Sequence, residues 1–268
     1  MSKEMAERTN LAEILTHVFQ KLEQSIPNTP HNAPTLLQAW TAVLGGPERT
    51  PLDVVASIGQ LSSILIKLET QIRESKKLKD YQINSALHCV AQFKIYFAIE
   101  RFNENSHPHK QNCNELNRGH LGIVGISLEA EFSEPKLEAH DAEELIAELN
   151  AIKDILAKSV IPIDLRINLT KHVNAMIWWL SHPDMVSIQD VFETSGSAIL
   201  IAQQMRDRDP DANMSQPTQN PSITVYEKVV WAATKLGKLV GLTSRGIEAA
   251  DRISSDAHHL LGSINLPT

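Results

Sequence analysis

The chain has 268 residues, of which 42% are hydrophobic and 21% charged, with a formal net charge of −7. This composition is ordinary for a folded protein of one large or two modest domains. The negative charge excludes a protein that coats nucleic acid through its overall charge. The two cysteines, Cys89 and Cys113, exclude a disulfide framework and favour a reducing cytoplasm. No signal peptide and no uncharged stretch of roughly 20 residues is found, so the chain is predicted to be soluble.

Apolar residues at helical spacing predict four helices in the first 102 residues. These helices are expected over about residues 11–26, 36–44, 51–72 and 80–102. In the third, Thr50 is the expected cap and Pro51 occupies the first turn, where no amide donor is missed. Its expected buried face runs from Leu52 through Val55 to Ile72.

The polar stretch 103–120 is aperiodic and is predicted to be a loop. Its possible zinc ligands have no standard spacing, so no metal site is predicted; they are His107, His109, Cys113 and His120. Alternating apolar residues from Ile126 to Phe132 then favour one short strand within 124–132. The end of a helix is the open alternative, because a lone strand needs a partner.

Helical periodicity resumes at Asp141 and continues, with a break at Pro162, to about residue 205. The stretch 206–222 contains three prolines and is predicted to be a linker. The predicted class is an all-α multi-helix array with a C-terminal amphipathic segment. Its predicted parts are a bundle (1–102), a polar loop (103–120), a second helical region (121–205), a linker (206–222) and a helical tail (223–268).

The pair His140-Asp141 is the closest match to an enzyme signature, that of a metal phosphohydrolase. The pair comes just before an apolar-periodic run, and Glu144 follows Asp141 by three residues. That spacing is typical of a capping box, in which Asp141 accepts from the amide near Glu144. The pair is therefore interpreted as a helix start, and His140 as a solvent-exposed residue.

The segment 223–242 allows three interpretations. Lys228, Lys235 and Lys238 share one helical face, with Trp231 as a further contact, and apolar residues share the other. The helix is expected to dock on the protein's own core, with a membrane surface as the first alternative. The second alternative is a DNA-reading helix-turn-helix over 233–252, although Gly246 and the acidic residues there disfavour it.

Two stretches carry a resemblance: "ELIAELNAIKDILAKSVIPIDLRINLTKHVNAMIWWL" and "VFETSGSAIL". The helix ending at Ser159, the break at Pro162 and the small-residue patch at Gly196 are similar to those of a loose class of bacterial and phage helical proteins. The resemblance covers about residues 141–262. It implies a bacterial or phage cytoplasmic origin, and no catalytic residues can be carried over.

The function expected from the sequence is non-enzymatic binding of another macromolecule, in a toxin-neutralising or phage-defence setting. Residues 127–159 hold nine carboxylates against three lysines, which favours a basic protein partner. The expected contact residues are Glu129, Glu131, Glu134, Trp178 and Trp179, and neither a cofactor nor a metal is expected.

An enzyme is the remaining alternative. Its site would be assembled from residues distant in sequence, among them His172, His182, Asp184 or the histidines of the 103–120 stretch.

Overall fold

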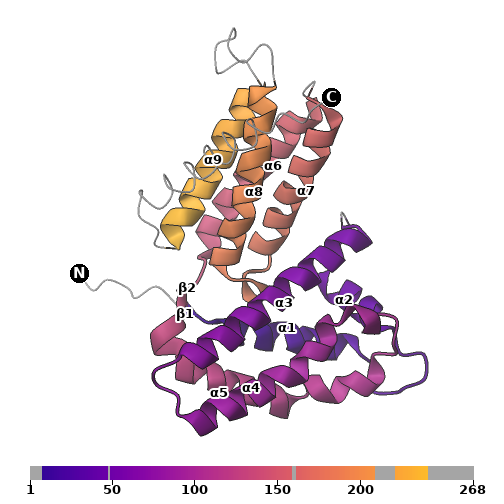
Figure 1. Ribbon diagram of the computed structural model, residues 1–268. Helices are drawn as coiled ribbons and strands as arrows, with labels where there is room; N and C mark the ends of the chain where they lie inside the picture. The colour runs from indigo at the N-terminus through magenta and orange to yellow at the C-terminus, as the bar shows by residue number, and fades with distance from the viewer. Residues whose placement is uncertain (1–7, 48, 159–160, 209–220, 241–268) are drawn as a thin grey trace, which may run out of the picture. The chain divides into compact units, whose positions relative to one another are not determined.

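The computed structural model describes residues 8–47, 49–158, 161–208 and 221–240, and this part of the chain is helical, as predicted (Figure 1). Its α-helices are α1 (Leu11–Ser25), α2 (Leu36–Leu44), α3 (Pro51–Glu74), α4 (Asp80–Phe93), α5 (Glu115–Phe132), α6 (Ala139–Lys158), α7 (Ile163–Leu180), α8 (Ile188–Asp207) and α9 (Pro221–Leu239). Short 3₁₀ helices cover Lys94–Phe97, Ile99–Arg101, His107–Cys113 and Pro183–Met185. Two-residue strands β1 (Arg8–Thr9) and β2 (Glu134–Pro135) pair antiparallel, with Thr9 opposite Glu134.

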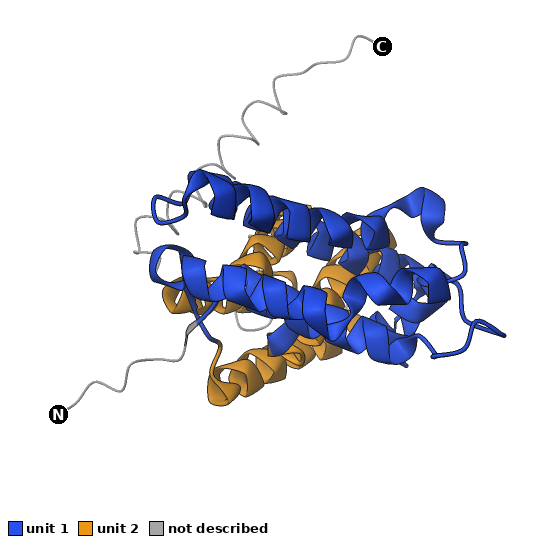
Figure 2. Cartoon of the chain, turned by 90° about the horizontal axis from the view of Figure 1, so that it is seen from below, with its two compact units in different colours: residues 1–136, 184–187 blue, residues 137–183, 188–268 orange. Residues whose placement is uncertain are grey.

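The chain divides into two compact units, coloured separately in Figure 2. Unit 1 contains the described residues up to Lys136 together with Asp184–Ser187, and unit 2 contains those of 137–183 and from Ile188 onward. The division falls later in the chain than the expected boundary at residue 102, because α5 packs against α1, α3 and α4. Most of the expected linker, residues 209–220, lies outside the described residues.

Polar side chains cap the starts of α1 and α3, and the cap of α3 is the predicted one. The Asn10 side chain accepts from the Glu13 amide at 3.0 Å, and the Thr50 hydroxyl accepts from the Asp53 amide at 3.3 Å. Pro51 occupies the first turn of α3, as predicted. The expected buried face of α3 is partly wrong, because Leu52 is 66% exposed and Val54 is buried in its place.

The core of unit 1 gathers aromatic rings around α1. Phe19 stacks on Phe93 with ring centroids 4.1 Å apart, and Tyr96 lies 5.6 Å from Phe19. Trp40 of α2 is fully buried, and its indole nitrogen donates to the Tyr96 carbonyl at 2.8 Å. Among the described helices, α3 alone is long and apolar enough to cross a membrane, but it packs on α1, α2, α4 and α5. Helix α3 therefore packs within the set of helices that forms unit 1.

Helix α5 corrects two expectations about residues 103–132. The expected loop is largely helical, because residues 107–113 form a 3₁₀ helix and α5 begins at Glu115, capped by the Asn114 side chain. The expected strand within 124–132 is wrong, and the alternative of a helix end is correct. Leu121, Gly125 and Leu128 are buried at the i, i+4, i+7 spacing of a helix, whereas Ile126 points away from them. The alternating apolar residues of 126–132 therefore lie on opposite sides of one helix, a pattern that a short strand would show as well.

Unit 2 contains helices α6 to α9. Helix α9 packs against α6 and α8, as the docking interpretation predicted. Its buried face and the facing part of α8 hold many small residues, which let the two helices approach closely. These small residues are Ala198 and Ala202 of α8 and Ala232, Ala233 and Gly237 of α9.

Candidate interaction groove

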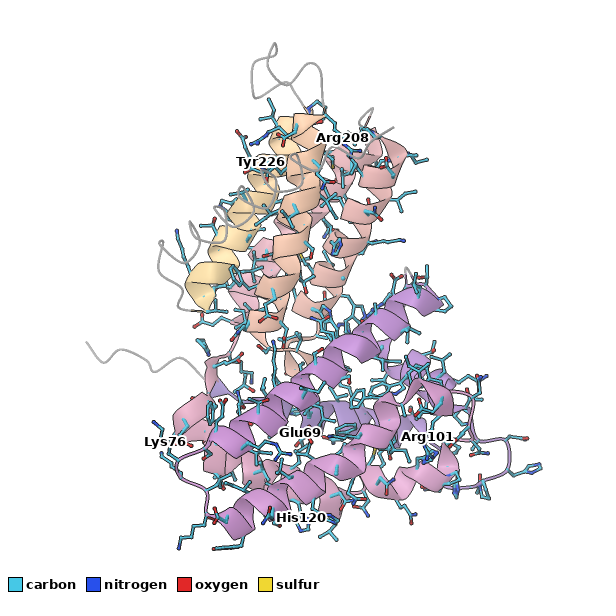
Figure 3. The ribbon with its side chains drawn as sticks, viewed as in Figure 1. Glu69, Lys76, Arg101, His120, Arg208 and Tyr226 are labelled. Carbon is cyan, nitrogen blue, oxygen red and sulfur yellow. The ribbon has the colours of Figure 1, made fainter. Side chains whose placement is uncertain are left out.

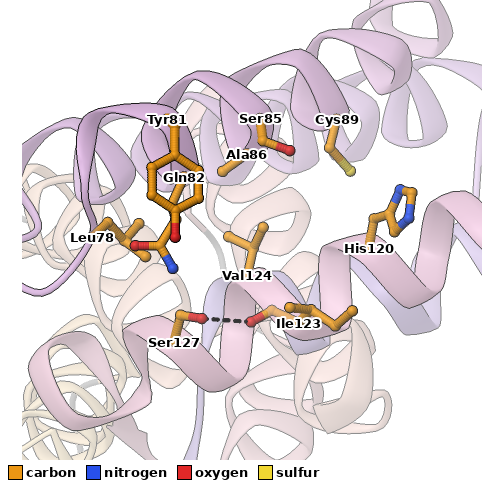
Figure 4. Close-up of a pocket in the computed structure, with 10 residues that line it drawn as sticks. All are labelled: Leu78, Tyr81, Gln82, Ser85, Ala86, Cys89, His120, Ile123, Val124 and Ser127. Carbon is orange, nitrogen blue, oxygen red and sulfur yellow. Dashed lines mark hydrogen bonds between the residues drawn. The ribbon is translucent and has the colours of Figure 1, made fainter.

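Helices α4 and α5 of unit 1 enclose a groove with a volume of about 300 Å³ (Figure 4). One wall comes from α4 and from Leu78, two residues before it, and the other comes from α5. The lining residues are Leu78, Tyr81, Gln82, Ser85, Ala86 and Cys89 on the first wall and His120, Ile123, Val124 and Ser127 on the second. The volume is at the lower end of the roughly 300–1,000 Å³ typical of ligand pockets.

The groove exists because each helix buries its opposite face. Helix α4 turns Val90 and Phe93 inward, and α5 turns Leu121 and Leu128 inward. At Gly125 the added Cβ of any other residue would lie 2.8 Å from the Asn10 side chain, so α5 approaches the start of α1 closely. The close approach holds α5 against unit 1 while its other face is left open toward α4.

The mouth of the groove is apolar and exposed. Tyr81 is 68% exposed and Ile123 is 63% exposed, and Ile126, one turn farther on α5, is 73% exposed. The Ser127 hydroxyl donates to the Ile123 carbonyl at 2.9 Å, so it requires no external partner (Figure 4). Large apolar side chains gathered in this way mark binding surfaces more often than isolated ones do.

Electrostatics play a small part in the groove. None of its described lining residues carries a carboxylate, an ammonium or a guanidinium group. Near its Leu78 end the exposed lysines 76, 77 and 79 lie close in sequence to Asp80, and Glu129 is exposed on α5. The charged groups therefore lie outside the lining, which is mostly apolar and otherwise carries hydroxyl, amide, thiol and imidazole groups.

Both cysteines are buried thiols with little nucleophilic character. Burial raises the pKa of Cys89 to about 11 and that of Cys113 to about 12. Cys89 is 8% exposed at the edge of the groove and packs there as a small apolar group.

We expect iodoacetamide at pH 8 to leave both cysteines of the folded chain unmodified. The same reaction time should label both cysteines completely when the chain is unfolded in guanidinium chloride. The thiolate is the reactive form, and a pKa of about 11 makes it about 100-fold rarer at pH 8 than a pKa of 9.0 does. Intact-mass spectrometry measures the result. The labelling rate of Cys89 should rise between pH 9 and pH 11; rapid labelling of the folded protein at pH 8 would contradict the buried geometry.

The predicted acidic contact residues are only partly available. Glu129 is exposed. Glu131 accepts from the Ser75 hydroxyl at 2.5 Å and from the Lys76 amide at 3.2 Å, and Glu134 accepts from the Ser187 hydroxyl at 2.5 Å. Two of the three carboxylates therefore hold unit 1 together.

The predicted tryptophan pair divides between core and surface. Trp179 is 1% exposed, which makes it a core residue of unit 2 and corrects its assignment as a partner contact. Trp178 is half-buried and stacks on the His182 ring, with centroids 4.2 Å apart. The His182 ring nitrogen also lies 2.7 Å from the Trp178 carbonyl, so this histidine has a structural role.

The start of α6 confirms the interpretation of His140-Asp141 as a helix start but corrects its details. The helix begins at Ala139, so Asp141 lies within the first turn and is not the cap. Its carboxylate, together with that of Glu144, binds Lys235 of α9 instead of a backbone amide. His140 is exposed, as expected.

Two of the three lysines of α9 form ion pairs with α6, and the third is exposed to solvent. Lys228 pairs with Glu148 at 2.5 Å, and Lys235 pairs with Asp141 at 3.1 Å and with Glu144. Burial by itself lowers the pKa of Lys235, but the hydrogen bonds and charges of Glu144 and Asp141 outweigh it, so the pKa is raised. Lys238 is exposed and Trp231 is 38% exposed. A membrane could reach the apolar face of α9 only after the helix undocks.

Within the described ranges, the other titratable residues proposed as site residues have separate surroundings. His107 contacts the Asn28 carbonyl at 3.1 Å, and His109 contacts Glu104 at 3.1 Å. Burial lowers the pKa of His172, which lies ten residues, or roughly 15 Å along a helix, before His182. Among the described residues, no three His, Cys, Asp or Glu side chains gather as metal ligands do. Most of the expected helix-turn-helix, from residue 241 on, lies outside the described residues.

Comparisons of the chain with protein-family models, with characterised proteins and with solved structures find no match.

Sequence reasoning missed the groove. Tyr81, Ile123 and Ile126 were available as signals, because each is a large apolar residue on the polar side of its helix. The helical period of α5 had to be recognised first, and the alternation at 126–132 concealed it.

Proposed function

We propose that the chain is a non-enzymatic interaction protein and that unit 1 binds another protein through the groove between α4 and α5. The supporting observation is the exposed apolar mouth formed by Tyr81 and Ile123, with exposed Ile126 one turn farther along α5, over a cavity whose described lining has no carboxylate, ammonium or guanidinium group. A groove between two helices accepts the apolar face of a partner helix, whose side chains enter it at one-turn intervals. Tyrosine is also enriched among the residues that contribute most to protein binding.

The partner's chemistry follows from the same surface. It presents aliphatic or aromatic side chains to the cavity and few charges. A basic partner is a further part of the proposal, suggested by the nine carboxylates against three lysines in residues 127–159. A cytoplasmic location and a toxin-neutralising or phage-defence setting are further parts of it, suggested by the resemblance of residues 141–262.

The test places the photo-crosslinking amino acid p-benzoylphenylalanine at position 81 in cells that express the chain naturally. Tyr81 is an exposed aromatic residue, so the replacement conserves the local shape. Ultraviolet irradiation should give a discrete adduct with one protein. Ile123→Asp in the same chain should reduce the adduct at least about tenfold, because a carboxylate at the mouth would have to be desolvated against an apolar face.

Two controls distinguish the groove from general stickiness. Leu116→Asp changes another exposed apolar residue of α5, 66% exposed and outside the groove lining, and should leave the adduct unchanged. The crosslinker at Trp231 in unit 2 should not give the same adduct. Equal adducts from positions 81 and 231, or an adduct insensitive to Ile123→Asp, would reject the proposal.

A further inference from the structure

The outward face of α3 is uncharged along most of the helix. Six exposed positions follow one another at intervals of four and three residues, which places them in a single stripe. They are Leu52, Ala56, Gly59, Ser63, Ile66 and Thr70. Leu52 is 66% exposed and Ile66 is 58% exposed. The stripe, named here the α3 seam, is roughly 27 Å long at 1.5 Å per residue.

Removing water from the polar side chains of the α3 seam costs little free energy. The Ser63 hydroxyl donates to the Gly59 carbonyl at 3.2 Å, and the Thr70 hydroxyl donates to the Ile66 carbonyl at 3.1 Å. Both side-chain donors are thus satisfied within the helix, so burying them leaves no donor without a partner. A Cβ added to Gly59 would meet no atom within 4 Å, so a second backbone has room to approach there.

Charged residues of α3 lie beside the seam, not on it. Asp53 and Lys67 are fourteen residues apart, which puts them on the same flank near opposite ends. On the other flank Glu69, labelled in Figure 3, pairs with Lys94 of α4 at 2.7 Å. An exposed helix of a globular protein normally presents charged residues on its outward face, so the seam is a helix face that lacks its contact.

We propose that two copies of the chain associate through the α3 seam, with the two helices antiparallel. In that arrangement, centred on residue 61, the six positions form matched layers in which Leu52 meets the partner's Thr70, Ala56 meets the partner's Ile66, and Gly59 meets the partner's Ser63. The two largest side chains therefore meet smaller ones, as close packing requires. A parallel pair would set Leu52 against Leu52 and Gly59 against Gly59, leaving the helices pushed apart at one layer and unfilled at the other.

Charge favours the same orientation. An antiparallel pair brings Asp53 near the partner's Lys67, whereas a parallel pair places the flanks that carry these residues on opposite sides of the interface. Asp53 already accepts hydrogen bonds from Thr50, so this attraction orients the encounter more than it adds affinity. Antiparallel helix dipoles also attract. A single helix pair is at the small end of stable interfaces, so we expect a dimer that dissociates on dilution.

Cysteine crosslinking tests both the association and its direction. In the proposed dimer residue 59 faces residue 63 of the other copy, while the two residues 59 are displaced along the helices and too far apart to bridge. Mixed Gly59→Cys and Ser63→Cys proteins should therefore form a disulfide-linked heterodimer under mild oxidation, and each variant alone should form at least fivefold less. The native cysteines are buried and contribute little background.

Sedimentation velocity over a concentration series completes the test. Wild-type chain should shift toward a dimer at high concentration, and Gly59→Arg should stay monomeric with unchanged circular dichroism. Gly196→Arg is the matched control, because Gly196 on α8 also has open space around it, and it should dimerise like wild type. A chain that is monomeric throughout, homodisulfides of Gly59→Cys alone, or a monomer that floats with neutral phosphatidylcholine vesicles would overturn the proposal.

Discussion

Replacing Trp40 with alanine should lower the free energy of unfolding of unit 1 by about 3–5 kcal/mol, the range for large core aromatics. Trp40 is fully buried, and its ring centroid lies 5.7 Å from that of Phe97. The substitution leaves a cavity and removes the donor to the Tyr96 carbonyl, so an acceptor in the core loses its partner. Hydrogen exchange of α1 and α2 peptides, followed by mass spectrometry, measures the change in unit 1.

Trp40→Phe separates the two contributions. It keeps most of the ring volume and removes only the indole donor, so we expect a smaller loss of about 1–3 kcal/mol. Peptides from α7, in unit 2, provide the internal reference in the same experiment. A loss below about 1 kcal/mol for Trp40→Ala would show that Trp40 is not a core residue of unit 1.

Leu236→Asp should undock α9 from α6 and α8 at a cost of about 4 kcal/mol or more, because it places an unpaired carboxylate in an apolar contact. Leu236 is fully buried, and Asp141 and Glu144 bind Lys235 one residue earlier. The new carboxylate therefore faces repulsion as well as desolvation. Limited proteolysis should cleave within 221–239 in the variant and spare that region in the wild-type chain.

The same variant tests the membrane alternative for α9. Undocking exposes the apolar face together with Lys228 and Lys235, so flotation with anionic vesicles should rise at least about fivefold over wild type. Lys238→Asp is the control, because Lys238 is exposed, and it should change neither proteolysis nor flotation. Equal flotation of the wild-type chain and Leu236→Asp would mean that α9 reaches the membrane without leaving its unit.

Local sequence signals predicted the helix starts well. The Thr50 side chain bonds the amide of Asp53, three residues later, and Pro51 fits the first turn by its own geometry. The cap of α3 can therefore be predicted without the rest of the chain. The same holds for Asn10 at α1. The capping box at Asp141 failed for the opposite reason. Its two carboxylates fit both a backbone amide and a lysine, and Lys235, ninety-one residues after Glu144, decides between them.

The candidate site required the tertiary fold. The alternation at 126–132 fits a strand and also fits opposite sides of one helix, and only the packing of Leu121 and Leu128 within unit 1 selects the helix. Once α5 is helical, Ile123 and Ile126 must point outward. The groove between α4 and α5 follows from how the two helices pack side by side, which no local pattern specifies.

The sequence by itself determined the all-α class and the approximate extent of most helices, because these depend on periodicity and on capping within a few residues. It left the docking of α9 open among three interpretations, and only the packing of α9 on α6 and α8 decides between them. Tertiary structure decided which of several apolar faces each helix buries. Leu52 was expected on the buried face of α3, but Val54 is buried instead. A helix with apolar residues on both sides can bury either side, and the helices that pack against it determine which one. The faces left outside, the groove at Tyr81 and the α3 seam, are the surfaces on which both proposals rest.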